Sequence, residues 1–405
     1  MAEKVVVIGS GPAGLMAGIS AAKQGREVLV LEFLPDIGRK LLASGAGKCN
    51  FTNMLDAESM AERYAPEQRR FVKPALLSFT PDNVRDFFAG QGVKYKLVDD
   101  FYCFPVSEKA SDILQVLLDR LTFYGARVLC NTPVSGLKIE NERICGVYSH
   151  EKFFPCDYLI AAAGGPGFPR LGGHASLDKL FAANNITVLD RTPALCGIKS
   201  NDLWLNGLAG IVLDKTVLTL DKKNFAQGTL LFTGDGISGP AALDMSGRAA
   251  IALRDGKKVV LRLNIAPEKN RSDWQELLEK ARQENGKKLI RNLFNHHLPQ
   301  AVASAITQAA GAGEMIAANL SKTVQERLLE YLTNAPINVS GVESWEKAMA
   351  STGGVDRSKI NSKTMQSKEI ANLYLAGEFI DVDAPCGGYN IQWAFSSGYL
   401  AGLLK

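Results

Sequence analysis

The chain has 405 residues, of which 46% are hydrophobic and 22% charged, and its formal net charge is +4. This length exceeds what one compact core holds, so it predicts two or three domains, and the composition excludes wholesale disorder. The small net charge gives no support for a nucleic-acid or membrane-surface function, and we expect neither partner.

Seven cysteines are present, an odd number, and no two of them are spaced as C-x-x-C. This usage argues against a disulfide framework or a zinc site, and no metal is expected. No uninterrupted apolar stretch reaches the roughly 18 residues of a membrane span. The apolar run 5–8 is followed at once by Gly9, which is typical of a strand entering a turn rather than of a signal peptide. We therefore expect a cytoplasmic protein.

The hydrophobic pattern predicts an alternating α/β chain with a different texture in its middle. Strands are expected at 5–8, 27–31, 126–130, 134–139, 144–148 and 158–162, then at 212–220, 259–263 and 373–376. Helices are expected at 12–24, 67–78, 82–90, 108–124 and 389–404, with a helical block over 272–332. A glycine-rich loop is expected over 38–50.

Gly9, Gly11 and Gly14 form a G-x-G-x-x-G motif between the first strand and the first helix. The first glycine permits a tight turn, the second lets a pyrophosphate approach the backbone, and the third lets helix and strand pack closely. The helix N-terminus presents free N–H groups to the phosphates. Glu32 ends the second strand, where a carboxylate can accept hydrogen bonds from ribose hydroxyls. Together these features predict a dinucleotide site.

The C-terminal sequence distinguishes FAD from NAD. The strand 373–376 ends in Gly377 and Glu378, and Gly388 opens the final helix. A reduced flavin carries negative charge near N1 and O2, which a helix N-terminus stabilises. The arrangement resembles that of FAD enzymes of the glutathione-reductase type, whose Gly-acid strand end reaches the ribityl chain or the pyrophosphate. The segment 161–165 resembles the alanine–glycine crossover of such proteins.

Three longer strings carry a closer resemblance: 38–53 (GRKLLASGAGKCNFTN), 231–240 (LFTGDGISGP) and 377–398 (GEFIDVD to GGYNIQWAFSSG). They are similar to a bacterial flavoprotein family that includes aminoacetone oxidases and 3-dehydro-bile-acid 4,6-reductases. The resemblance implies an FAD-dependent oxidoreductase with a Rossmann-like FAD-binding domain in two parts, 1–190 and 350–405. It also implies an inserted β-rich domain, 191–349, with a helical subdomain at about 268–334.

The resemblance assigns FAD contacts by position. The expected residues are Gly9, Gly11, Ala13, Gly14, Glu32, Arg39, Lys40, Ser44, Gly45, Gly47, Asn50, Val134, Ala163, Gly164, Gly377, Glu378, Gly388, Asn390 and Ile391. The chain departs from the family at Ala46, Lys48 and Gly234, where many members carry Gly, Arg and His. The absence of that His argues against transferring a His-based mechanism to this chain.

The expected chemistry is hydride transfer between the flavin and a small organic substrate bound between the FAD domain and the insert. Asp381, Asp383 and Tyr389 are candidate proton donors, and turn or helix-cap roles are equally good interpretations of the two aspartates. Cys49 lies in the flavin loop without a resolving cysteine nearby, so a packing role is favoured. The substrate and the oligomeric state are not predicted.

Several alternatives stay open. Gly234, Gly236 and Gly239 repeat the G-x-G-x-x-G spacing and could form an NAD(P)H site, with NAD(P)H as electron donor. The strand 259–263 ends in Asn264 without an acidic residue, so a tight loop closing over FAD is the better interpretation. Direct oxidation of a substrate with O2 as acceptor is the other possibility. A flavin-dependent tRNA-modifying protein and a non-catalytic flavoprotein are further alternatives. The scattered Lys and Arg residues count against the RNA-modifying one.

Overall fold

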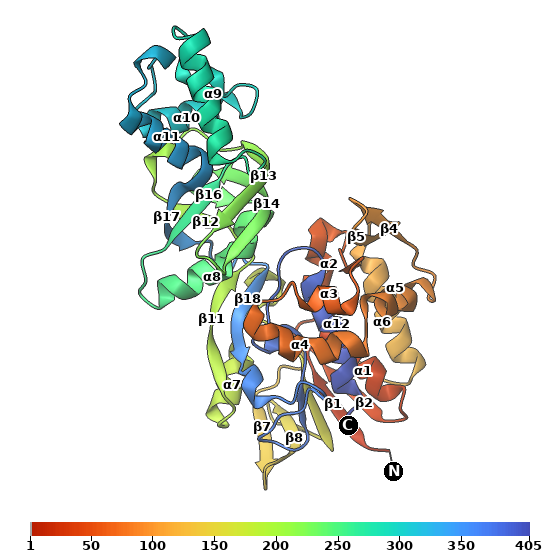
Figure 1. Ribbon diagram of the computed structural model, residues 1–405. Helices are drawn as coiled ribbons and strands as arrows, with labels where there is room; N and C mark the ends of the chain where they lie inside the picture. The colour runs from red at the N-terminus through yellow and green to blue at the C-terminus, as the bar shows by residue number, and fades with distance from the viewer. Residues whose placement is uncertain (1) are drawn as a thin grey trace. The chain divides into compact units, whose positions relative to one another are not determined.

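The computed structural model describes residues 2–405, and it divides into two compact units, each with its own hydrophobic core. The first unit ends at Thr192 and resumes at Ala350, and the second comprises Pro193–Met349. Figure 1 traces the chain. It leaves the first unit along β11 (Val188–Ala194) and returns along β18 (Ala350–Val355), and these two strands pair with each other.

The first unit is built on a five-stranded sheet in which every neighbouring pair is parallel, in the order β19-β10-β1-β2-β6. Besides the β11–β18 pair, its other strands form two small antiparallel sheets, β3-β5-β4 and β7-β8-β9. The bounds are β1 (Lys4–Ile8), β2 (Glu27–Leu31), β3 (Thr52–Asn53), β4 (Tyr95–Val98), β5 (Tyr102–Pro105), β6 (Arg127–Leu129), β7 (Gly136–Glu140), β8 (Arg143–Ser149), β9 (Lys152–Pro155), β10 (Tyr158–Ala161) and β19 (Leu373–Leu375). This parallel sheet with crossover helices confirms the predicted Rossmann-like fold class.

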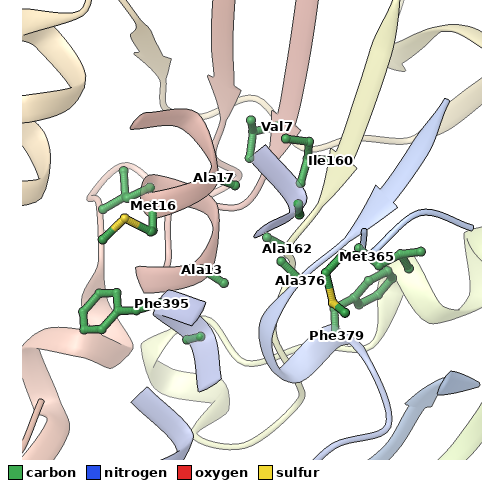
Figure 2. Packing of buried hydrophobic residues seen from close by; sticks show 14 of the residues in the cluster. Val7, Ala13, Met16, Ala17, Ile160, Ala162, Met365, Ala376, Phe379 and Phe395 are labelled. Atoms are coloured by element: carbon green, nitrogen blue, oxygen red, sulfur yellow. The ribbon is translucent and has the colours of Figure 1, made fainter. Parts of the chain in front are cut away.

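The helix α1 packs on β1, β2 and β10 of this sheet and against both α6 and α12, and α12 contacts β19. The helices of the first unit are α1 (Pro12–Ala22), α2 (Arg39–Ala43), α3 (Ala57–Ala61), α4 (Pro66–Ser78), α5 (Pro81–Ala89), α6 (Ala110–Phe123), α7 (Ser176–Ala183) and α12 (Tyr389–Gly402). Figure 2 shows the packing at the carboxyl ends of the strands, where Ala13 of α1 faces Ala162 and Ala376, which follow β10 and β19. Small side chains at these positions let helix and strand backbones approach closely.

The second unit contains a closed barrel in the order β12-β15-β14-β13-β16-β17. The strands of the barrel are β12 (Ile198–Ser200), β13 (Val212–Thr219), β14 (Phe225–Thr233), β15 (Gly236–Ser238), β16 (Val260–Asn264) and β17 (Ala335–Val342). The helices of the second unit are α8 (Pro240–Arg254), α9 (Arg271–Glu284), α10 (Gln300–Ala310) and α11 (Lys322–Asn334). The helices α9, α10 and α11 follow one another between β16 and β17.

Several expected elements differ from the observed ones. The loop at 38–50 contains the short helix α2 and a tight turn at Ser44–Gly47, in which Cys49 N–H donates to Ser44 O at 2.9 Å. The expected helical block over 272–332 is three helices, and α10 ends at Gly311, which adopts a left-handed φ of 83°. The first helix ends at Ala22, just before Gly25 at φ 81°.

No helix of residues 2–405 is long and apolar enough to cross a membrane.

The contact between α1 and α12 gives a first prediction. An added Cβ at Gly398 of α12 would lie 2.3 Å from the carbonyl oxygen of Ala13. We expect Gly398→Ala to destabilise the protein by about 1–3 kcal/mol, although alanine is intrinsically the better helix residue by roughly 1 kcal/mol. Thermal unfolding measures the change. Gly341→Ala is the matched control, because no heavy atom lies within 4 Å of its added Cβ. Equal melting temperatures for both variants would contradict the close packing.

Candidate FAD site

The glycine motif forms the predicted turn between β1 and α1. Gly9 adopts a φ of 98°, and an added Cβ there would lie 2.5 Å from the carbonyl oxygen of Ala162. An added Cβ at Gly14 would lie 1.9 Å from Gly9 O, so the turn admits no side chain at either position. At Gly11, in contrast, no heavy atom lies within 4 Å of such a Cβ. The backbone at Gly11 is therefore approachable by a ligand.

No side chain caps the N-terminus of α1, where Gly11 is the N-cap residue. The first N–H groups of a helix have no partner within the helix. Here they lie beside half-buried Gly11, where the space next to the backbone is open, and the helix dipole adds a partial positive charge. This combination is suited to a pyrophosphate group.

Glu32 lies after β2 with 7% of its surface exposed. Its Oε2 accepts hydrogen bonds from Ser10 N–H at 2.9 Å and Ser10 Oγ at 2.6 Å, and its Oε1 accepts one from Leu34 N–H at 2.9 Å. No ion pair to Glu32 occurs among residues 2–405. A carboxylate offers about four acceptor positions, so Oε1 retains capacity for a further donor such as a ribose hydroxyl. The segment carrying Val134 lies nearby, because Thr132 N–H donates to Glu32 O at 2.8 Å.

Lys40 and Glu378 join the loop near the N-terminus to the C-terminal Gly-acid motif. Lys40 Nζ lies 2.9 Å from Glu378 Oε2, and the two side chains are only 27% and 24% exposed. Glu378 Oε1 accepts from Ser351 N–H at 2.9 Å and Ser351 Oγ at 3.1 Å. Burial alone would raise the pKa of Glu378, but Lys40, Arg191 and the Ser351 hydrogen bond together lower it below its usual value. Glu378 is thus ionised at neutral pH.

The N-terminus of α12 also lacks a side-chain cap, and its N-cap residue Gly388 has a φ of 85°. An added Cβ at Gly388 would lie 2.9 Å from the carbonyl carbon of Thr52. With its amide oriented to suit its neighbours, Asn50 donates to Thr52 O at 2.8 Å and accepts from Gly388 N–H at 3.2 Å. The loop at 38–53 is therefore fixed against the start of the final helix.

The two uncapped helices run parallel, because Gly398 lies against Ala13 and Gly402 lies against Ala17. The first residue of α12, Tyr389, is nine residues before Gly398. At 1.5 Å per residue, α12 extends about 14 Å beyond the first turn of α1. The pyrophosphate and the ring of an extended dinucleotide are separated by a ribityl chain, and the spacing of the two helix ends suits such a molecule.

These observations test the fit of FAD to the chain, and they agree with it. The open face of Gly11, the spare acceptor of Glu32 and the two uncapped helix ends match a phosphate, a ribose and the pyrimidine edge of a flavin. The individual contacts of the predicted site residues stay predictions.

The other predicted FAD residues differ in their hydrogen bonds, backbone conformation and burial. Arg39 Nη2 donates to Arg170 O at 3.1 Å, and Ser44 Oγ donates to Leu41 O at 2.6 Å. Gly45, Gly47, Gly164 and Gly377 adopt left-handed φ values, and Ala163 and Ile391 are half-buried. Asn390 is occupied by its own loop, since Oδ1 accepts from Ala384 N–H at 3.0 Å and Nδ2 donates to Ala384 O at 2.8 Å. Its predicted contact with the flavin ring would use the hydrogen-bonding positions of the amide that these two bonds leave.

The candidate proton donors have protein partners. Asp381 Oδ1 accepts from Gly353 N–H at 3.0 Å, and its Oδ2 pairs with Arg357. Asp383 Oδ1 accepts from Gln68 Nε2 at 3.0 Å. Tyr389 is buried, and its carbonyl oxygen accepts from Tyr64 Oη at 2.9 Å. The contacts of both aspartates favour a role in holding the segment before α12.

Arg191 is the central residue that sequence reasoning missed. Its side chain is 4% exposed and pairs with Asp178, Nε to Oδ2 at 2.6 Å and Nη2 to Oδ1 at 3.0 Å. Its Nη1 donates to Ser351 Oγ at 3.0 Å and to Glu378 O at 3.0 Å. A single guanidinium thus joins α7, β18 and the Gly-acid motif. Nothing in the sequence around Arg191, in β11, indicates these partners.

Gln392 is a second residue that the sequence did not single out. It is fully buried in α12, accepts from Thr52 Oγ1 at 2.6 Å, and donates to Phe79 O at 3.0 Å and Ser396 Oγ at 2.9 Å. It links the final helix to β3 and to the residue that follows α4.

The remaining motifs have structural explanations. Burial raises the pKa of the Cys49 thiol to about 12, which opposes a reactive thiolate and agrees with a packing role. Gly234, Gly236 and Gly239 lie in and around the antiparallel pair β14–β15, whereas a nucleotide fingerprint requires a strand-to-helix turn of a parallel sheet. An added Cβ would lie 2.1 Å from Ile198 O at Gly236 and 2.8 Å from Thr229 O at Gly239, so these two glycines serve barrel packing.

No group of three or more His, Cys, Asp or Glu residues that could hold a metal ion occurs within residues 2–405.

Removal of the Glu32 carboxylate should weaken FAD retention. We expect Glu32→Ala to raise the Kd for FAD by roughly 10-fold or more, because a charge-assisted hydrogen bond contributes about 1.5–3 kcal/mol. Fluorescence titration of the apoprotein with FAD measures it. Glu27→Ala, at the exposed start of the same strand, is the control and should leave the Kd unchanged. Equal affinities for all three proteins would remove Glu32 from the site.

The Lys40–Glu378 pair gives a pH-dependent prediction. Because the folded-state pKa of Glu378 is lowered, the pair stabilises the protein above the ordinary carboxyl pKa, and this contribution is lost as the pH falls through the lowered value. Lys40→Met should therefore cost about 2 kcal/mol at neutral pH and less in acid, where Glu378 of the variant binds a proton. Urea unfolding at several pH values measures the difference. Lys48→Met is the control, since Lys48 forms a more exposed pair with Glu108. A deficit of Lys40→Met that stays constant with pH would contradict the assignment.

Comparison with known proteins places these features in a family. Residues 3–404 match the family model described as HI0933-like protein Rossmann domain. The chain is 32% identical over 407 residues to a ribosomal RNA dihydrouridine synthase of Haemophilus influenzae, covering 98% of this chain and 97% of the relative. It is 28% identical to a 3-dehydro-bile acid delta(4,6)-reductase of Clostridium scindens, covering 99% and 98%. A ribosomal RNA dihydrouridine synthase of Escherichia coli is also 28% identical, covering 97% and 96%.

Among solved structures, 3-ketosteroid delta1-dehydrogenase from Sterolibacterium denitrificans matches with a TM-score of 0.51 and 12% identity, over 99% of each chain. At this identity the likeness concerns the fold alone. The family match over nearly the whole sequence and the dinucleotide site geometry lead to one conclusion. The chain belongs to the HI0933-like family of FAD-binding Rossmann proteins and is an FAD-dependent oxidoreductase.

Proposed function

We propose that this oxidoreductase reduces a carbon–carbon double bond conjugated with a carbonyl group. The observation that carries the proposal is that relatives matched over both units are named for two reactions with this feature in common. A dihydrouridine synthase reduces the double bond of a uracil ring, which is conjugated with a ring carbonyl. A 3-dehydro-bile acid delta(4,6)-reductase acts on double bonds conjugated with a ketone.

FAD, when bound, supplies the hydride. In reduction of such a bond, the hydride adds to the carbon β to the carbonyl, and a proton adds to the α carbon. The chain contributes orientation and charge. The uncapped N-terminus of α12 supplies positive potential, and the ionised Glu378, tied to Lys40, holds the Gly-acid motif in place.

Our first candidate substrate is a uridine in ribosomal RNA. Two relatives, from two organisms, carry that activity in their names, and one of them is 32% identical over the full length. These names oppose the expectation from composition that no nucleic acid takes part. Net charge is summed over the whole chain and does not report a local RNA-binding surface, so a small net charge does not exclude RNA as a substrate.

Our second candidate is a free steroid-like enone, which the Clostridium scindens relative favours and which agrees with the predicted small organic substrate. The electron donor in our proposal is NADH or NADPH. It would react at the flavin itself, since the second glycine motif lies in an antiparallel pair of strands.

An anaerobic assay with the purified holoprotein tests both candidates. The protein receives NADPH or NADH together with unmodified ribosomal RNA transcript or a 3-oxo-4,6-diene steroid. Mass spectrometry of nucleosides and of the steroid then detects the gain of two hydrogens. We expect dihydrouridine at a defined position in the RNA. Reduction of the steroid alone would favour the second candidate, and a flavin that is bleached by donor but reoxidised by neither compound would contradict the proposal.

A further inference from the structure

We infer that one end of the barrel in the second unit is a binding surface for the phosphate backbone of RNA. The surface, here named the lysine surface, consists of Lys222, Lys223, Phe225, Lys257 and Lys258. The inference rests on the proposed RNA substrate and assigns a place where that substrate would be held outside the reaction centre.

The first two lysines lie at the tip of the β13–β14 hairpin, and the tip is well defined. Leu220 N–H donates to Asn224 O at 2.9 Å. The carboxylate of Asp221 accepts from Lys223 N–H at 2.8 Å, from Asn224 N–H at 3.0 Å and from Asn224 Nδ2 at 2.7 Å. This turn fixes the backbone while both lysine side chains are exposed. A fixed backbone reduces the entropy lost when a partner binds.

The second pair of lysines lies at the same end of the barrel. β13 ends at Thr219 opposite Arg262, and β16 begins two residues before that partner, at Val260. The chain reaches β16 from α8 through Gly256, whose φ is 74°, and Lys257 N–H donates to Ala252 O at 2.9 Å. This helix end presents Lys257 and Lys258, both exposed, just before the strand.

The acidic residues at this end of the barrel do not neutralise the four lysines. Within residues 2–405, none of the four lysines forms an ion pair. The nearby acids have partners of their own. Asp221 accepts the hydrogen bonds of the turn. The hydrogen bonds from Asn224 and Lys223, together with the positive charge of Arg248, lower the pKa of Asp221. Asp255 lies 3.1 Å from Arg254, and Arg262 of β16 lies 3.6 Å from Glu330. The unpaired charge at this surface is therefore positive.

An aromatic side chain completes the surface. Phe225 begins β14, pairs with Thr219 in the register, and is 63% exposed. Exposed lysines that track phosphates beside an aromatic ring that stacks on a base are the usual components of single-stranded nucleic-acid binding. Solvation of the lysines alone would not explain the exposed ring of Phe225. Because this ring can stack on a base, we choose RNA rather than an anionic lipid as the occupant.

The test compares the full-length holoprotein with a four-lysine variant, a two-lysine control and Phe225→Ala. One carries Lys222→Gln, Lys223→Gln, Lys257→Gln and Lys258→Gln. The control carries Lys287→Gln and Lys288→Gln, an exposed pair in the helical part of the same unit. Binding to a ribosomal RNA transcript is measured by fluorescence anisotropy over a range of salt concentrations. The flavin spectrum, the melting temperature and the rate of flavin reduction by NADPH are recorded for each protein.

We expect the four-lysine variant to bind RNA roughly 10- to 100-fold more weakly at low salt, with the slope of log K against log salt smaller by about 3. The control variant should bind within about 2-fold of the parent. Phe225→Ala should weaken binding several-fold with an unchanged salt slope, because stacking is not an ionic contact. The flavin properties should be the same in every variant.

Other outcomes would overturn the inference. If the parent forms dihydrouridine in RNA and the four-lysine variant binds that RNA as tightly, the lysine surface is wrong while the proposed function holds. If the parent neither binds nor reduces RNA, the proposed RNA substrate fails and the inference fails with it. Binding of the parent to vesicles of phosphatidylserine and phosphatidylcholine, lost in the four-lysine variant without any change in RNA affinity, would assign the surface to a membrane.

Discussion

The first and last helices of the chain touch along their backbones, and the rest of the FAD site depends on this contact. Gly398 and Gly402 are the positions of α12 where it meets α1, and an added Cβ at either would lie 2.3 Å from a carbonyl oxygen of α1. Helices that approach this closely cannot slide or separate without opening a gap in a densely packed core. The contact therefore sets how far the N-terminus of α12 extends beyond that of α1, and with it the spacing of the two uncapped helix ends that we propose bind FAD.

A second constraint is electrostatic and also joins distant parts of the sequence. Glu378 forms an ion pair with Lys40, from the loop near the N-terminus. Arg191 donates hydrogen bonds to the backbone carbonyl of Glu378 and to the Ser351 hydroxyl. Buried charges of this kind cost desolvation free energy, so they persist only where partners and hydrogen bonds compensate. The arrangement holds the Gly-acid motif, the crossover segment and α2 in one place. Rigidity of this sort keeps a cofactor oriented toward its substrate.

Much of the first unit could be predicted because its signals are local. The strand 5–8, the glycine turn and the strand 27–31 each show their structure within a few residues, and the structure has β1, α1 and β2 within two residues of those bounds. Arg191, Ser351 and Gln392 could not be predicted in the same way. Their importance comes mainly from partners 13 to 340 residues away in the sequence, and nothing in the neighbouring residues indicates those partners. The glycine spacing at 234–239 is that of a nucleotide motif, but in the structure these residues join the adjacent antiparallel strands β14 and β15, which the spacing alone does not indicate.

The family match shows an FAD-dependent oxidoreductase, and the proposal of a reduction rests on full-length relatives whose named substrates share a conjugated double bond. Both would use the same held FAD, so the account depends on one cofactor that contacts both ends of the sequence. Hydrogen–deuterium exchange of the apoprotein with and without added FAD measures this directly. We predict that FAD slows exchange at residues 9–14 and at residues 388–393 together, with the same dependence on FAD concentration. Protection of one segment without the other would contradict the account.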